Sequence, residues 1–199
     1  MAAQLPRFSG FADPIFDAQA TFRSVMSAVA NPGRIEVLSV VADMPLRLAT
    51  SLAAAALALF DHDTFVFLDR SFASDPNIAA SLSFHTGCRF VEDPSRATFA
   101  LIGDPGGCPK FSGFAQGTLE YPDRSTTLLF QVERLDNEAA LTLRGPGIPG
   151  VRHLAAVPLP ASISEELGAN RERFPQGVDL LLCCGSRLAA LPRSTRVEG

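Results

Sequence analysis

Residues 178–184 read Val-Asp-Leu-Leu-Leu-Cys-Cys, an almost unbroken apolar run that lies between Pro175-Gln176-Gly177 and Gly185. Strands that are covered on both faces of a parallel sheet have continuous apolar runs of this kind. The run therefore predicts a strand in the centre of a sheet. Shorter runs upstream predict further strands at residues 35–41, 64–68, 89–91 and 97–102.

Helix signals alternate with these strands. Asp13 and Pro14 predict the start of an amphipathic helix, which Asn31-Pro32-Gly33 ends. Further helices are expected over residues 46–60 and from a capping Ser164. Another is expected over residues 78–84, after the start signal Asp75-Pro76 and before Gly87, which ends it. This alternation predicts an α/β fold, a three-layer α/β/α sandwich in which helices cover both faces of a mixed, mostly parallel sheet. We expect residues 1–199 to form a single domain.

Two strand-like runs, residues 125–132 and 139–144, interrupt the alternation. Only a few residues separate them, which favours a hairpin and hence antiparallel pairing. The next segment, Gly145-Pro146-Gly147-Ile148-Pro149-Gly150, is expected to form a shaped turn. Its glycines tolerate positive φ, whereas its prolines fix φ.

The charge content excludes one class of function. The 199 residues include 17 basic and 21 acidic side chains, and Lys110 is the only lysine. A nucleic-acid partner is therefore not expected, because bulk electrostatic binding requires clustered Lys and Arg. The longest apolar run, residues 52–60, is shorter than the roughly 20 residues of a membrane span. With no secretory apolar segment near the N-terminus, we expect no membrane partner and a cytoplasmic location.

No complete catalytic or metal-binding motif is present, so no catalytic residue, metal or cofactor is expected. The four cysteines lack zinc-binding spacing and are expected to be reduced core thiols. The glycine loop at residues 103–109 matches neither GxGxxG nor the P-loop. Lys110 beside this loop is the basis of an alternative, a stand-alone enzyme that uses pyridoxal phosphate (PLP) through a Schiff base. A solvent-exposed lysine is the favoured interpretation.

One candidate ligand site surrounds the glycine-proline turn. Arg144, Arg152 and His153 flank it, and successive backbone N–H groups at Gly145 and Gly147 could form an anion nest. The alternative is a turn that only redirects the chain.

Phenylalanine supplies almost all the aromatic area, with 15 Phe, one Tyr and no Trp. Three of these residues, Phe8, Phe11 and Phe16, lie close together near the N-terminus. Chain termini are usually loose unless they are docked, and rings without a polar atom favour dry contacts. We therefore expect these three rings to pack across a homodimer or against another subunit.

Several short sequence segments, taken in order, resemble those of the PhnH family, whose members are subunits of the bacterial carbon-phosphorus lyase system. These segments are residues 17–19, 21–26, 31–34, 84–87, 143–148, 170–179 and 191–195. The resemblance implies a homodimer that joins sibling subunits in a core complex for organic phosphonate catabolism. That complex forms ribose 1-alkylphosphonate 5-triphosphate from ATP and an alkylphosphonate.

The resemblance also bears on the fold and on catalysis. Members of the family are similar in fold to the large domain of PLP-dependent transferases, although the family is not known to carry PLP. Catalysis is credited to a sibling subunit. We therefore expect a required subunit without a proven active site of its own.

Overall fold

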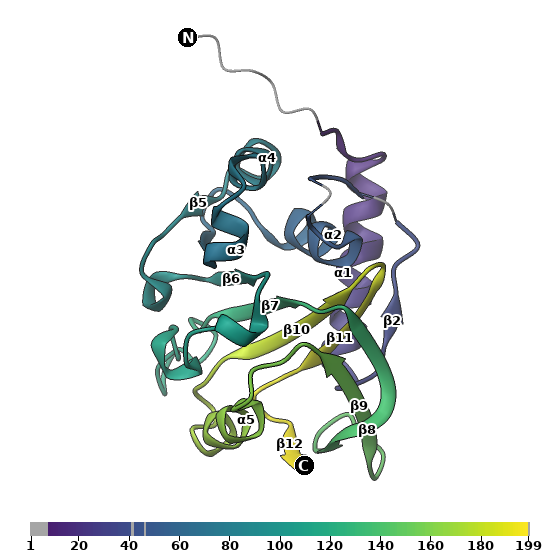
Figure 1. Ribbon diagram of the computed structural model, residues 1–199, viewed down its shortest axis with the longest axis vertical. Coiled ribbons are helices and arrows are strands. Elements are labelled where there is room, and N and C mark those ends of the chain that lie inside the picture. Colours follow the sequence, from purple (N-terminus) through teal and green to yellow (C-terminus); the bar gives the residue numbers. More distant parts are fainter. Residues whose placement is uncertain (1–7, 41, 46, 199) are drawn as a thin grey trace.

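A computed structural model describes residues 8–40, 42–45 and 47–198 (Figure 1). The helices are α1 (Pro14–Ala30), α2 (Thr50–Leu59), α3 (Arg70–Ala73), α4 (Pro76–Thr86) and α5 (Ile163–Glu172), with short 3-10 turns η1 (Pro94–Arg96), η2 (Pro105–Gly107) and η3 (Phe111–Gly113). The strands are β1 (Gly10–Phe11), β2 (Glu36–Val37), β3 (Ala42–Asp43), β4 (Phe65–Leu68), β5 (Arg89–Phe90), β6 (Phe99–Ile102), β7 (Thr127–Gln131), β8 (Arg134–Arg144), β9 (Arg152–Val157), β10 (Asp179–Cys184), β11 (Arg187–Leu191) and β12 (Arg196–Glu198).

A seven-stranded mixed sheet forms the centre of the fold, in the order β2-β11-β10-β7-β6-β4-β5. The five strands from β10 to β5 are mutually parallel, and β11 is antiparallel to both of its neighbours. Strand β10 lies between β11 and β7, and its three leucines are at most 2% exposed. The predicted α/β class, the mostly parallel sheet and the central position of residues 178–184 are therefore confirmed.

Helices α1 to α4 cover one face of this sheet (Figure 1). Helix α1 begins where predicted, because the Asp13 carboxylate accepts hydrogen bonds from the N–H groups of Ile15 and Phe16. Helix α4 is capped in the same way by Asp75 and ends at Gly87, which has φ of 74°. Helix α2 begins at Thr50, later than the predicted residue 46. Its Ala53 to Ala56 segment is fully buried against the sheet.

On the opposite face of the central sheet, the elements that pack against it differ from those predicted. Helix α5 packs there together with a separate three-stranded antiparallel sheet, in the order β12-β8-β9 (Figure 1). The expectation of helices on both faces is thus met only in part. The second sheet suits this position because its inner side chains, including Leu135, Leu143 and Leu154, are fully buried while residues 137–140 are exposed.

The predicted hairpin between residues 125–132 and 139–144 is wrong. Strand β7 pairs in parallel with β6 and β10, whereas β8 pairs with β9 and β12. The reason is burial: Leu128, Leu129 and Phe130 are covered on both faces, which only the central sheet provides. The β8–β9 pair is instead closed by the glycine-proline turn.

Two other predicted boundaries also differ. The expected strand at residues 35–41 is short, since β2 ends at Val37 and β3 at residues 42–43 pairs with β1. Helix α5 starts at Ile163 and not after a capping Ser164. No helix within the described part of the chain is long and apolar enough to span a bilayer.

Candidate functional site

The glycine-proline turn between β8 and β9 is packed against the end of α1. Gly145, Gly147 and Gly150 all have positive φ, as expected, with values of 138°, 77° and 75°. A Cβ atom on Gly147 would lie only 2.0 Å from the carbonyl oxygen of Ala30. The turn therefore does more than redirect the chain, because its backbone contacts the C-terminal end of α1.

The flanking side chains that were expected to share this site lie on two faces of the small sheet. Arg152 is paired with Leu143 in the ladder, and Nη1 of Arg152 donates hydrogen bonds to the carbonyl oxygens of Asn31 (3.0 Å) and Pro32 (2.7 Å). Arg152 thus binds the two residues that directly follow α1. Its guanidinium has thereby found acceptors within the chain.

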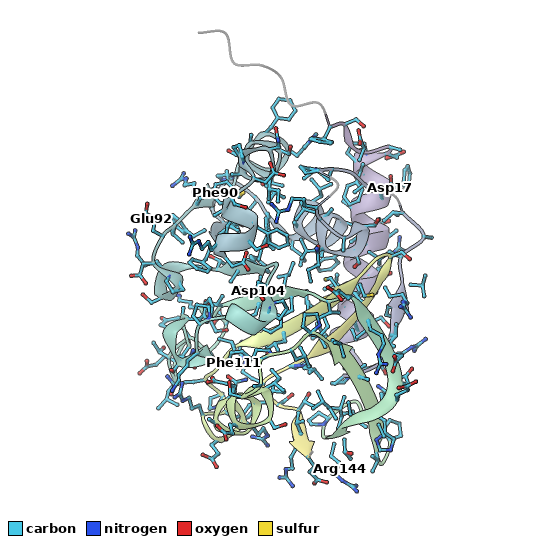
Figure 2. The ribbon with its side chains drawn as sticks, viewed as in Figure 1. Asp17, Phe90, Glu92, Asp104, Phe111 and Arg144 are labelled. Atoms are coloured by element: carbon cyan, nitrogen blue, oxygen red, sulfur yellow. The ribbon has the colours of Figure 1, made fainter. Side chains whose placement is uncertain are left out.

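Arg144 and His153 lie on the opposite, outer face of the same small sheet. Nε of Arg144 lies 3.6 Å from Oε2 of Glu198, and the Arg144 side chain is 49% exposed (Figure 2). His153 is exposed and lies beside Thr142 in the ladder. Arg144 and His153 therefore share the outer face of the small sheet, and Arg152 lies on its inner face. The turn glycines lie between Arg144 and Arg152 in the sequence.

Two arginines outside the predicted site, Arg196 and Arg171, line a cavity beside β12. Arg196 on β12 is the ladder partner of Arg144. Arg196 also lines a cavity of about 410 Å³ together with Arg171 and Phe174 of the α5 region. Nε of Arg171 is buried and has no hydrogen-bond partner, and its guanidinium lies over the Phe174 ring. The short strand β12 has no clear apolar pattern, so no local signal indicated that Arg196 would be there.

Arg193 connects four segments near this end of the molecule. Its guanidinium binds the Asp179 carboxylate and donates to the carbonyl oxygens of Pro122 (2.8 Å) and Pro175 (3.3 Å) and to the Ser125 hydroxyl. Its side chain is only 12% exposed. Arg193 and Asp179 both belong to the sequence segments on which the family resemblance rests. In this structure they hold neighbouring segments together.

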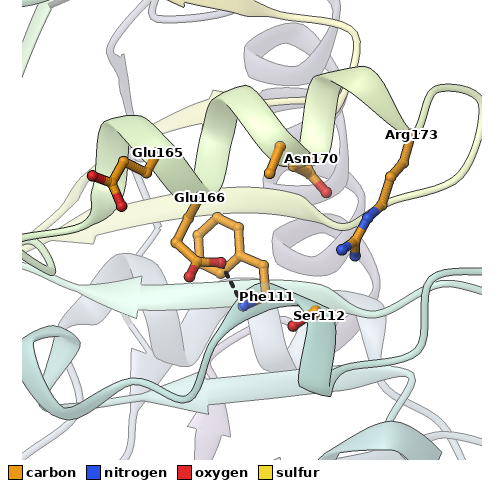
Figure 3. A pocket seen from close by; sticks show the side chains of 7 residues that line it. Phe111, Ser112, Glu165, Glu166, Asn170 and Arg173 are labelled. Carbon is orange, nitrogen blue, oxygen red and sulfur yellow. Dashed lines mark hydrogen bonds between the residues drawn. The ribbon is translucent and has the colours of Figure 1, made fainter.

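A pocket of about 210 Å³ lies between η3 and α5 (Figure 3), and Lys110 directly precedes η3 in the sequence. Glu166 Oε2 accepts a hydrogen bond from the N–H of Phe111 (2.9 Å). Glu165 also lines the pocket, while Arg173 at its other end donates to Gln116 (3.0 Å). The carboxylates give the end of the pocket at the first turn of α5 a negative charge, which disfavours phosphate groups there.

The surroundings of Lys110 do not fit PLP. Lys110 is exposed, precedes the short turn η3, and is not part of the lining of the neighbouring pocket. A PLP site needs a lysine directed into a cavity, a partner for the ring nitrogen and donors for the phosphate. The pocket offers Glu165 and Glu166 in the place of phosphate donors. The structure therefore gives no support to the alternative of a PLP-dependent enzyme that uses Lys110.

Three of the four thiols have raised pKa values. Burial raises the pKa of Cys183 to about 12. Burial, together with the charges of Asp69 and Glu166, also raises the pKa of Cys108 to about 12. Burial raises the pKa of Cys88 as well. Thiols with such pKa values remain protonated at neutral pH and are poor nucleophiles and metal ligands.

The histidines have local roles. Nε2 of His85 is 3.0 Å from the carbonyl oxygen of Phe8, and so fastens the chain before β1 to the end of α4. His62 lies 3.3 Å from the Asp63 carboxylate in an exposed turn. Among the residues that the structure describes, no group of three or more His, Cys, Asp or Glu side chains could hold a metal ion.

The three N-terminal rings have different surroundings. Phe11 is 8% exposed and belongs to the core beneath α1, Phe8 is half-buried, and Phe16 is 68% exposed. Four further exposed apolar residues lie along α1, and we call them the α1 stripe. The α1 stripe consists of Ile15, Phe22, Met26 and Val29, which are 77%, 47%, 48% and 36% exposed.

The α1 stripe adjoins a small apolar cavity. Val29 lines this cavity of about 230 Å³ together with Val25, Leu59 and Phe99, at the amino-terminal ends of the central strands. The α1 stripe is thus apolar surface that no other described part of the chain covers.

Comparison with known proteins identifies the family. The family described as "Bacterial phosphonate metabolism protein (PhnH)" matches residues 9–198, from β1 to the end of β12. The chain belongs to the PhnH family. The match includes the whole central sheet, the glycine-proline turn and both ends of α1.

Two relatives extend the comparison beyond the family match. The chain is 42% identical, over 100% of its length and 99% of the relative, to "Alpha-D-ribose 1-methylphosphonate 5-triphosphate synthase subunit PhnH" of Rhizobium meliloti (strain 1021). It is 30% identical to "Putative C-P lyase subunit protein HtxG" of Stutzerimonas stutzeri, over 90% of this chain and 85% of that one. Both names describe subunits of larger enzymes.

Proposed function

We propose that this chain is a subunit of a carbon-phosphorus lyase core assembly in organic phosphonate catabolism. In that assembly it supports the formation of ribose 1-alkylphosphonate 5-triphosphate from ATP and an alkylphosphonate. The observation that carries this proposal is the end-to-end match, at 42% identity, to a subunit named for that product. The chain is proposed to be required without being the catalytic subunit, and to work in the cytoplasm.

The same proposal includes the fold relationship and the ligand surface. The mixed, mostly parallel sheet with helices on one face supports a likeness to the large domain of PLP-dependent transferases. Among the residues around the turn, Arg144 and His153 have the exposure to contact an anionic ligand, whereas Arg152 acts from behind by fixing the turn to α1. The proposed ligand surface therefore consists of Arg144, Gly145, Gly147 and His153, and Arg152 is the residue that positions it from the other face.

Co-purification tests the assembly. The tagged chain is coexpressed with the other carbon-phosphorus lyase subunits of a host that uses phosphonates, and the expected result is recovery of those subunits in stoichiometric amounts. A chain that purifies alone while the other subunits are present in soluble form would contradict the proposal.

We further propose that the α1 stripe is the contact surface of a homodimer. Phe22 lies midway between Ile15 and Val29 along a helix of 17 residues. Two antiparallel copies of α1 related by a twofold axis at Phe22 would therefore place Ile15 of one copy against Val29 of the other. Such self-complementary contacts are what a twofold dimer requires, and C2 dimers are the commonest oligomers.

Sedimentation of two variants tests the homodimer. Phe22→Ser with Met26→Ser is expected to reduce the mass from dimer to monomer, since truncating well-packed apolar anchors in an interface costs about 2 kcal/mol or more each. The control, Arg124→Ser, changes an exposed side chain outside α1 and is expected to remain dimeric. Phe16→Ala is expected to weaken the dimer without loss of stability, whereas Phe11→Ala also removes a core ring. A dimer that persists in the double variant would exclude the α1 stripe as the contact.

A further inference from the structure

The carboxyl ends of β4 and β6 form the place at which the central sheet changes direction. From β4 the chain proceeds to β5 on one side and then to β6 on the other side of β4. In open α/β sheets, ligands bind in the crevice outside the strands at such a switch point. In this chain the crevice lies between Asp69, directly after β4, and Gly103, directly after β6.

Asp69 fills the crevice with its own carboxylate. The side chain is 6% exposed. Its Oδ1 accepts a hydrogen bond from the N–H of Phe72 (2.9 Å), and its Oδ2 accepts from the N–H groups of Gly103 (2.9 Å) and Asp104 (2.8 Å). A Cβ atom on Gly103 would lie 2.9 Å from the Phe72 ring, so the two loops are already in close contact.

The adjacent part of this edge is closed in the same manner. At the end of β7, Gln131 Oε1 accepts from the N–H of Ala49 (2.6 Å) at the start of α2, and its Nε2 donates to the carbonyl oxygen of Arg47 (2.9 Å). The N–H of Ser51 donates to the carbonyl oxygen of Gly185 (2.7 Å). Two backbone donors at the start of α2, the N–H groups of Ala49 and Ser51, are therefore also paired within the chain.

We infer that Asp69 is an internal anion that takes the place of a phosphate-bearing ligand in the crevice of this sheet. The three N–H groups that would hold a phosphate are already satisfied, and an incoming phosphate would meet a buried negative charge. The chain consequently binds no anionic cofactor or nucleotide phosphate at the site that its fold ordinarily offers. Any anion that it contacts must be held on another surface.

The inference predicts that removing the carboxylate creates a phosphate site. In Asp69→Ser the hydroxyl can still cap the Phe72 N–H, while the N–H groups of Gly103 and Asp104 become free. The matched control is Asp75→Ser, which changes the exposed cap of α4 in the same chemical way. The probe is inorganic phosphate at constant ionic strength, and the measurement is the midpoint of thermal unfolding.

The expected result is a gain of function in one variant. Phosphate at ten times its Kd is expected to raise the midpoint of Asp69→Ser by about 3 to 5 °C, as ligand linkage predicts for a domain of this size. Wild type and Asp75→Ser should shift by less than about 1 °C. A folded Asp69→Ser that is indifferent to phosphate overturns the inference. A rise of the midpoint with phosphate in wild type that is lost in Asp69→Ser also overturns the inference.

If Asp69→Ser does not fold, hydrogen exchange in a second variant tests whether the Asp69 carboxylate holds these backbone donors. Asp69→Asn keeps the shape of the side chain but has one acceptor oxygen in place of two. The one amide oxygen can accept either from Phe72 or from Gly103 and Asp104, so hydrogen exchange is expected to accelerate at least tenfold at one or more of these three amides, while the Asn77 amide on α4 remains unchanged. Unchanged exchange at all three amides would show that the Asp69 carboxylate does not hold these donors.

Discussion

Arg193 shows how much one side chain can contribute when it lies between segments that are distant in sequence. Arg193→Ala removes the cation beside the half-buried Asp179 carboxylate and the donor for two proline carbonyls. We expect the free energy of unfolding to fall by about 3 kcal/mol, because breaking a largely buried pair leaves an uncompensated charge. Urea unfolding provides the measurement. Arg124→Ala, which removes an exposed guanidinium stacked on Tyr121, should cost less than about 1 kcal/mol. Equal losses in the two variants would contradict the buried role of Arg193.

Cys108 allows a second prediction at this scale, through the pH dependence of its alkylation. A pKa of about 12, against the ordinary value of 9.0, lowers the thiolate fraction at neutral pH by about a thousandfold. The neutral thiol is the stable form below that pKa, and the thiolate forms only as the pH rises through it. In a variant whose only cysteine is Cys108, the alkylation rate is expected to rise about tenfold per pH unit up to at least about pH 10. A rate that levels off near pH 9 would disprove the shift.

At the scale of elements, the glycine-proline turn offers a matched pair of substitutions. Gly147 and Gly150 have nearly the same φ, 77° and 75°, but a Cβ atom would meet the Ala30 carbonyl at 2.0 Å only at Gly147. Gly150→Ala should therefore cost only the left-handed backbone strain of about 1 to 2 kcal/mol. Gly147→Ala should cost at least about 3 kcal/mol, because the turn must also move away from α1. Chemical denaturation of both variants measures the difference, and equal costs would mean that the turn does not depend on its contact with α1.

At the scale of the whole molecule, one central sheet separates two cores, and this makes a single unfolding transition the expected behaviour. Neighbouring cysteines report on the two sides, since Cys183 belongs to the core beneath α1 to α4 and Cys184 to the core beneath α5 and the small sheet. Because β10 contributes to both cores, we expect single-cysteine variants at these positions to become reactive toward a thiol reagent at the same urea concentration. Two separate midpoints would show that residues 1–199 unfold as more than one unit.

Local signals in the sequence determined the α/β class, the central strand at residues 178–184 and the ends of α1 and α4. These features depend on neighbouring residues, namely on the caps at Asp13 and Asp75, on Gly87 and on continuous apolar runs. The positive φ of Gly145, Gly147 and Gly150 was predictable for the same reason, because glycine is the residue that tolerates it.

Tertiary structure alone decided which strands pair and which polar groups are left free. The separation of β7 from β8 follows from competition for the central sheet, which no short segment encodes. Nothing in the sequence indicated that Asp69 and Arg193 would be structural, and Arg152 was expected at a ligand site; each of the three binds groups in a segment at least 14 residues away. The same holds for Phe11 and Phe16, which are five residues apart but lie in the core and at the surface. Burial and long-range pairing are set by the register of distant elements, and for that reason the site residues could be named from the sequence but not placed.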